Sequence, residues 1–274
     1  MSDTELHKFA QILSVRLNSL TDKKALHIYR TLIPSDSFRN NVPLLYLDYI
    51  NLNGRYLQVL SLVEELGANP SDLFFVDLMK FYNQFYTQKN IDVPHPSKPS
   101  QFDQFYSVLK GRYYGGCLLS ANQIDSGIRE EILKECENLP VSYFLLEIIP
   151  ALILIEAFEF LDELFELYYE DIFEFGVWSS STTQSVYLIG LAYVNLRKNE
   201  IKTARKNLDF VNIERVELGY EKYILLFYYL VDLKITFEAK AIIKNRFAQK
   251  KMMKLVKETG FKRFELLSSS YCLD

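Results

Sequence analysis

The stretch TTQSVYLIGLAYVNLRKNEIKTARKNLDFV, residues 182–211, decides the fold of this chain. In its first half, apolar residues such as Leu188 and Leu191 recur at spacings of three and four, which is the period of an α-helix and not of a strand. The polar run RKNE then interrupts the pattern, and a second helical period follows it. The stretch predicts a helix over 182–196, a turn, and a helix over 201–211.

Small residues in this stretch favour a close packing of helices. Gly190 and Ala204 have the size needed where two helices approach closely, and Tyr193 and Leu208 are large enough to fill the space beside them. This arrangement resembles a tetratricopeptide-like unit. It predicts a stack of helical hairpins in which each hairpin hides its apolar face against its neighbours.

The rest of the chain shows the same helical period. The 274 residues contain only 10 glycines and 8 prolines, which argues against a turn-rich sandwich or barrel. Three prolines fall within TQKNIDVPHPSKPS, residues 87–100, where they favour an extended linker. We therefore expect an all-α protein with one domain over residues 1–86, a Pro-rich linker over 87–100, and a helical-repeat domain over 101–274.

The front domain contains a pattern typical of a helix-turn-helix. Residues 57–75, LQVLSLVEELGANPSDLFF, have an apolar helix, then Leu-Gly, a short turn and an acidic residue before Leu-Phe. This order resembles the last two helices of a repressor-like DNA-binding domain. The expected fold is thus an N-terminal helix-turn-helix-like domain followed by a tetratricopeptide-like repeat.

Together the two parts resemble one bacterial family, the Rgg/MutR and PrgX-like pheromone-responsive regulators of Gram-positive bacteria. The resemblance lies mainly in three stretches: FEFGVWSSSTTQSVYLIGLAYVNLRKNEIKTARKNLDFVNI (173–213), YEKYILLFYYLVDLKI (220–235) and KLVKETGFKRFELL (254–267). It implies that the chain is a homodimeric, cytoplasmic transcription regulator. The repeat domain would bind a short signalling peptide, and the front domain would bind promoter DNA.

The DNA-binding prediction rests on polar and basic residues near the front of the chain. They are Lys23, Lys24, Arg39, Asn40, Asn41 and Arg55. The front domain departs from the family's pattern, because residues 44–46 are Leu-Leu-Tyr where polar base-reading residues are typical. Residues 1–75 also carry 7 basic and 8 acidic groups, although DNA affinity depends largely on Lys and Arg. The domain is therefore degenerate, and the alternative function is a helical-repeat scaffold that binds a protein partner and no DNA.

The predicted peptide site lies on the helix over 182–196. Polar amides suit peptide capture because each can donate to and accept from an extended backbone, and aromatic rings add rigid contact area. By helical spacing, four residues share one face, and two on a later helix would continue the surface. The six residues are Gln184, Tyr187, Leu191, Asn195, Tyr223 and Phe227.

Charge is unevenly distributed along the chain. Residues 76–196 carry 7 basic and 17 acidic groups, whereas residues 197–274 carry 17 and 10. Within the acidic part, five glutamates recur at helical spacing and predict a solvated helix face, or a surface that prefers basic peptides. They are Glu156, Glu159, Glu163, Glu166 and Glu170.

The basic stretch 240–263 predicts an amphipathic helix, because the apolar residues Ile243, Phe247, Met253 and Val256 are interleaved with its basic ones. Its outer side is a solvated face, a surface for nucleic acid or an acidic partner, or a complement to residues 76–196.

No enzyme motif is present, so no catalytic residue, metal or cofactor is expected. The chain lacks G-x-G-x-x-G, G-x-S-x-G and H-E-x-x-H, and the sequence identifies no base that could activate Cys117.

The three cysteines have no C-x-x-C spacing, which favours a reducing compartment. The N-terminus has no secretory signal, and the most apolar segment, 141–161, is interrupted by glutamates. These features predict a cytoplasmic protein with no membrane span.

Overall fold

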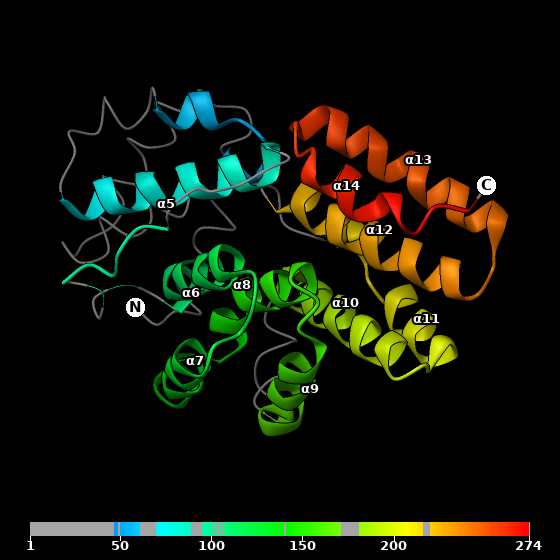
Figure 1. Ribbon diagram of the computed structural model, residues 1–274, viewed down its shortest axis with the longest axis horizontal. Helices are drawn as coiled ribbons and strands as arrows, with labels where there is room; N and C mark the ends of the chain where they lie inside the picture. Colours follow the sequence, from blue (N-terminus) through cyan, green and yellow to red (C-terminus); the bar gives the residue numbers. More distant parts are fainter. Residues whose placement is uncertain are drawn as a thin grey trace.

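The computed structural model describes residues 47–48, 50–60, 70–88, 95–100, 102, 105, 107–139, 141–170, 181–215 and 220–273. Within these ranges the regular structure is helical and contains no strand, which confirms the all-α prediction (Figure 1). The helices are α5 (Pro70–Thr87), α6 (Ser107–Ala121), α7 (Ser126–Asn138), α8 (Val141–Leu154), α9 (Phe158–Leu167), α10 (Ser181–Arg197), α11 (Ile201–Asp209), α12 (Glu221–Glu238), α13 (Ile242–Thr259) and α14 (Arg263–Ser269), with a short 3-10 turn η4 (Ile213–Arg215).

Successive helices pair into hairpins. α10 packs against α11 and α12 against α13, and the first helices α8, α10 and α12 also contact one another in order. The bounds of α10 and α11 lie within two residues of the predicted helices over 182–196 and 201–211. The helical period and the polar turn were therefore sufficient to locate this hairpin.

The turns of three hairpins share one backbone geometry. In each turn, a residue with positive φ precedes a residue whose N–H donates to the carbonyl five positions earlier, which is the hydrogen bond of a Schellman helix end. These pairs are Glu156 and Ala157, Asn199 and Glu200, and Lys240 and Ala241, with N···O distances of 3.0, 2.8 and 2.9 Å. The turns recur about 40 residues apart, as expected of a helical repeat.

Gly190 lies where helices approach closely, as its size suggested. A Cβ atom at this position would lie 2.9 Å from Ile149 of α8 and 3.0 Å from Phe165 of α9. The close approach is therefore to the preceding hairpin rather than to α11. Ala204 and Leu208, on the inner side of α11, are fully buried.

The apolar core continues on both sides of the Pro-rich segment 87–100. Tyr86 of α5 stacks on Phe261 and Phe264 near the end of the chain, with ring centroids 4.9 and 5.8 Å apart. His95, from the segment itself, packs between Phe81 and Tyr113 at centroid distances of 5.2 and 4.9 Å. The described part of this segment is therefore packed against α5 and α6.

Candidate peptide-binding site

α10 presents one partly exposed stripe. Between Thr182 and Leu196 every side chain is buried except four, which lie three or four positions apart. These four are Gln184, Leu188, Leu191 and Asn195. The stripe thus combines two amides, which can pair with a peptide backbone, with two aliphatic side chains. The sequence located three of the four, and it missed Leu188.

Tyr187 lies in the core rather than on this stripe. Its side chain is fully buried, its ring meets Phe165 edge-on at 5.9 Å, and its hydroxyl lies 3.5 Å from the Val141 carbonyl. Leu188, the next residue along the helix, is the one that faces outward in place of Tyr187. A Tyr–Leu pair at adjacent positions gives no sequence signal for which of the two faces inward.

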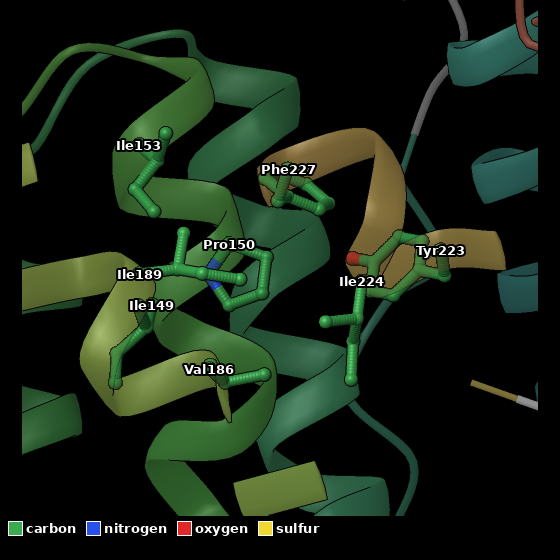
Figure 2. Close-up of a pocket in the computed structure, with 8 residues that line it drawn as sticks. All are labelled: Ile149, Pro150, Ile153, Val186, Ile189, Tyr223, Ile224 and Phe227. Carbon is green, nitrogen blue, oxygen red and sulfur yellow. The ribbon is translucent and has the colours of Figure 1, made fainter. Parts of the chain in front are cut away.

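Tyr223 and Phe227 occupy a different place from the stripe. Both are buried on α12 and face α8 and α10 across a narrow apolar crevice, which Figure 2 shows. The lining residues are Ile149, Pro150, Ile153, Val186, Ile189, Tyr223, Ile224 and Phe227. The crevice has a volume of ≈ 10 Å³, which is about the space of one water, and an apolar space of that size stays dry. The structure therefore does not bring the six predicted residues onto one surface.

A second partly exposed stripe, on α12, escaped the sequence analysis. Leu225, Tyr228 and Tyr229 are half-buried, and the rings of the two tyrosines meet edge-on at 5.2 Å. Near them, Arg205 of α11 pairs with Asp232 of α12. This ion pair joins the two hairpins beside the tyrosines.

A buried ionic network centred on Arg112 of α6 adjoins the crevice at Tyr223. Its guanidinium contacts the Asp48 carboxylate at 3.0 Å and the Glu147 carboxylate at 2.7 Å, and it lies 4.7 Å from the ring centre of Tyr82. Its Nη1 atom is 3.5 Å from the Tyr223 hydroxyl, which also lines the crevice. The network thus joins the helical turn around Asp48 to α5, α6, α8 and α12.

The network holds one guanidinium against two carboxylates. Burial raises the pKa of Asp48, and the Arg112 charge only partly opposes this. For Arg112 burial acts to lower the pKa, but the Asp48 and Glu147 carboxylates outweigh it and the net change is upward. Glu147 also accepts a hydrogen bond of 2.7 Å from Tyr220, whereas both side-chain hydrogen bonds of Asp48 come from Arg112, at 3.2 and 3.0 Å. Asp48 therefore depends on Arg112 for its pairing, and Glu147 has a second partner.

A polar cleft of ≈ 280 Å³ opens between α6 and α7. Its lining combines three ammonium groups and two carboxylates, and consists of Lys98, Lys110, Tyr114, Glu131, Lys134, Glu135 and Asn138. Lys98 pairs with Glu131 at 3.4 Å and Lys110 with Glu135 at 3.3 Å. Because two of the three lysines already have acidic partners, the cleft is largely neutralised by its own side chains.

Cys117 has a neighbouring imidazole that the sequence did not reveal. Its Sγ lies 3.7 Å from Nδ1 of His95. Burial raises the pKa of Cys117 to about 11 and lowers that of His95 to about 4. At neutral pH both groups are uncharged, so the pair lacks the thiolate of an activated nucleophile.

Of the predicted DNA-binding residues, the structure describes Arg55, which is exposed. Lys23, Lys24, Arg39, Asn40 and Asn41 lie outside the described residues. The stretch that corresponds to a recognition helix is 37–54, of which the structure describes residues 47–48 and 50–54. Here the side chains of Leu47, Asp48, Ile50, Asn51 and Leu52 are buried. Asn51 donates to the Met79 carbonyl at 3.1 Å. These five side chains are used for packing and do not face a base.

The described residues contain neither a candidate membrane span nor a candidate metal site. No described helix has the length and apolar character required to cross a membrane. Among the same residues, no three His, Cys, Asp or Glu side chains gather as a metal site would require. No protein-family model, curated protein or solved structure matches this chain.

Proposed function

We propose that this chain is a helical-repeat protein that binds a short peptide on the outward stripe of α10. The observation that carries this proposal is the stripe itself, with Gln184 and Asn195 at its ends and two leucines between them. An extended peptide leaves backbone donors and acceptors unpaired, and amide side chains can satisfy both. The repeated hairpins support the proposal because stacked helical repeats are a common framework for peptide recognition.

The test is a peptide-array screen with the purified full chain, followed by fluorescence anisotropy with a labelled hit. Gln184→Ala combined with Asn195→Ala should weaken binding by at least about tenfold, since each lost hydrogen bond contributes roughly 1 kcal/mol. Thr203→Ala, at an exposed position of α11, serves as the matched control. Equal affinities for the double variant and the control would place the peptide elsewhere.

We propose further that peptide binding controls a DNA-binding front part, as the family resemblance implies. The supporting observation is the Arg112 network, which joins the turn around Asp48 to α6, α8 and α12. A shift of α12 on ligand binding would therefore reach the front part of the chain. Since the described side chains between Leu47 and Leu52 are buried, the phosphate and base contacts in this proposal fall to Arg55 and to residues before Leu47.

This second proposal is tested by titrating duplex DNA from the region flanking the gene, at several salt concentrations, with and without the peptide hit. Arg39→Ala with Arg55→Ala should lower the affinity and flatten its salt dependence, because fewer phosphates are neutralised. If DNA does not bind under any of these conditions while the peptide does, the chain is a helical-repeat scaffold without a DNA role. The peptide proposal then stands alone.

A further inference from the structure

α13 carries an outward face that differs from the one its sequence suggested. The side of the helix that packs on the molecule consists of Asn245, Ala248, Met252, Leu255, Val256 and Thr259, all buried. Ile243 and Phe247 lie on the opposite side, and 87% and 58% of their surfaces are exposed. The prediction that these two belong to the apolar side is wrong. The buried side was hard to identify from the sequence because it includes two polar residues, Asn245 and Thr259.

Basic side chains surround these two apolar residues. We define the basic face of α13 as Ile243, Lys244, Arg246, Phe247, Lys250, Lys251, Lys254 and Lys257, all of which are exposed. Only Lys254 has an acidic partner among the described residues, Glu258 at 3.8 Å. Exposed large apolar side chains grouped together mark an interaction surface. The face therefore requires a partner that is both acidic and partly apolar.

The chain itself contains a surface of that chemistry at the end of α9. We define the acidic end as Glu166 and Leu167 in the last turn of α9, Tyr169 and Glu170 just beyond it, and Glu159 in the first turn on the same helical face, all exposed. Its apolar members, Leu167 and Tyr169, have 57% and 58% of their surfaces exposed. Its three glutamates form no ion pair with a described residue, unlike the other two glutamates of the predicted acidic stripe. Those two, Glu156 and Glu163, pair with Lys234 and Arg129, so the stripe is not one uniform solvated face.

We propose that the basic face of α13 docks on the acidic end of α9 of a second copy of this chain. Each surface presents two exposed apolar side chains beside charged side chains of a single sign, which apart from Lys254 form no ion pair with a described residue, and the two signs are opposite. Opposite charges steer association and select the partner, while the apolar pairs supply burial. This contact goes beyond the proposed peptide binding and uses no residue of the α10 stripe.

The positions of the two surfaces determine how copies would associate. In Figure 1, α9 lies at the lower edge of the molecule and α13 at the upper right edge. A copy that offers its acidic end to α13 of a neighbour therefore leaves its own α13 free. Contacts between two different patches join copies into a closed ring or an open chain, depending on whether the rotation closes. We expect head-to-tail association that increases with protein concentration and weakens with salt.

Other occupants explain the two surfaces less well. The phosphate backbone of DNA would use the lysines but gives Ile243 no apolar contact. An anionic membrane would use both the lysines and the apolar pair, but it leaves the complementary acidic end without a role. A second copy accounts for both surfaces.

The experiment is sedimentation velocity of the full chain over a range of protein concentrations at low and high salt. Lys250→Glu with Lys254→Glu, and separately Glu159→Lys with Glu166→Lys, should each raise the concentration needed for half-association at least about tenfold. An equimolar mixture of the two variants should associate again, because opposite charges then meet in both orientations. The two unchanged surfaces meet each other, and so do the two charge-reversed ones. Lys202→Glu with Lys206→Glu, exposed positions on α11, gives the same charge change away from both surfaces and should behave as wild type.

Three results would overturn the proposal. The first is a wild-type chain that shows no salt-sensitive association at any concentration. The second is self-association of each charge-reversed variant, measured alone, at the same concentration as the wild type. The third is loss of association in each variant without recovery in the mixture. Binding of the wild type, but not of the α13 variant, to phosphatidylserine vesicles, together with any of these results, would assign the face to a membrane instead. Circular dichroism and thermal melting of each variant show that its fold is intact.

Discussion

At the scale of single residues, the most consequential side chain is Arg112. It is 2% exposed, and it holds together two carboxylates that come from distant parts of the sequence. Burying an ion pair contributes little net stability, but removing one partner leaves an uncompensated buried charge. The two carboxylates differ in this respect, because Glu147 also accepts from the Tyr220 hydroxyl, whereas the side-chain hydrogen bonds of Asp48 both come from Arg112.

Arg112→Met should therefore lower the free energy of unfolding by about 3–5 kcal/mol. Asp48→Asn should change it by less than about 1 kcal/mol, because an amide oxygen can still accept from Arg112 and the excess negative charge is removed. Urea denaturation at pH 7 measures both. A larger loss for Asp48→Asn than for Arg112→Met would show that Asp48, and not Arg112, is the essential charge.

The sign of the pH effect of Asp48 follows from its raised pKa. The folded chain binds this proton more readily than the unfolded chain, so the Asp48 contribution becomes more favourable as the pH falls through the folded pKa. In wild type this gain partly offsets the general loss of stability in acid. Asp48→Asn should therefore lose stability more steeply than wild type as the pH is lowered below neutrality.

Cys117 gives a second prediction at the residue scale. With a folded pKa of about 11, its thiolate is scarce at pH 8, and alkylation by iodoacetamide should be roughly 100-fold slower than in guanidinium-unfolded chain. The rate should increase steadily up to about pH 11. Mass spectrometry of the modified peptide measures this rate, and Cys117→Ser identifies the signal. Fast alkylation at pH 7 would show that His95 does activate the thiol.

At the scale of the helix, the turns after α8, α10 and α12 impose the same backbone requirement on three different residues. Each turn needs a positive φ, which glycine adopts without strain and asparagine tolerates, whereas lysine does not adopt it readily. Lys240→Gly should raise the free energy of unfolding by about 0.5–1 kcal/mol. Asn199→Gly should change it by much less. Thermal melts measure both, and destabilisation by Lys240→Gly would contradict the turn geometry.

The same turns show what the sequence could and could not predict. The α10–α11 hairpin was predictable because its apolar period stops at RKNE and resumes at Ile201. The repetition of the turn every 40 residues or so was not, because Glu156, Asn199 and Lys240 share a φ angle and not a side chain. Helix faces were the weakest part of the prediction. Where apolar residues occur at nearly every position, as at Tyr187-Leu188, only the packing decides which one turns inward.

Long-range contacts were the other part of the candidate site that the sequence did not reveal. Asp48, Arg112 and Glu147 meet although they are far apart in the chain, and no local pattern marks them as partners. The Cys117–His95 contact likewise depends on how the segment after Pro94 packs on α6. Such contacts follow from tertiary packing and not from period or spacing.

At the scale of the whole molecule, two helices from distant parts of the chain lie against each other. α5 contacts α14, and Phe264 is fully buried between Tyr86 and Phe227, at centroid distances of 5.8 and 5.2 Å. Gly54 reinforces the closure, because a Cβ atom there would lie 2.1 Å from the Thr259 carbonyl oxygen. The stack of hairpins is thus closed by contacts between distant ends of the described chain.

Phe264→Ala should therefore destabilise the molecule by about 3–5 kcal/mol and increase hydrogen exchange in α5 as well as in α14. Leu266→Ala, at a position 41% exposed in the same helix, should change the free energy of unfolding by less than about 0.5 kcal/mol. Exchange followed by mass spectrometry distinguishes the two. Protection of α5 that is unaffected by Phe264→Ala would show that the two ends fold independently.

The closure also has a consequence for synthesis on the ribosome. Tyr86 emerges long before Phe264, and at about 5–20 residues per second the delay between them is roughly 10–35 s. During that time Tyr86 lacks its stacking partners Phe261 and Phe264, so this end of α5 must stay uncovered or be shielded by a chaperone. Nascent chains stalled before α14 should consequently recruit chaperones more strongly than chains released at full length.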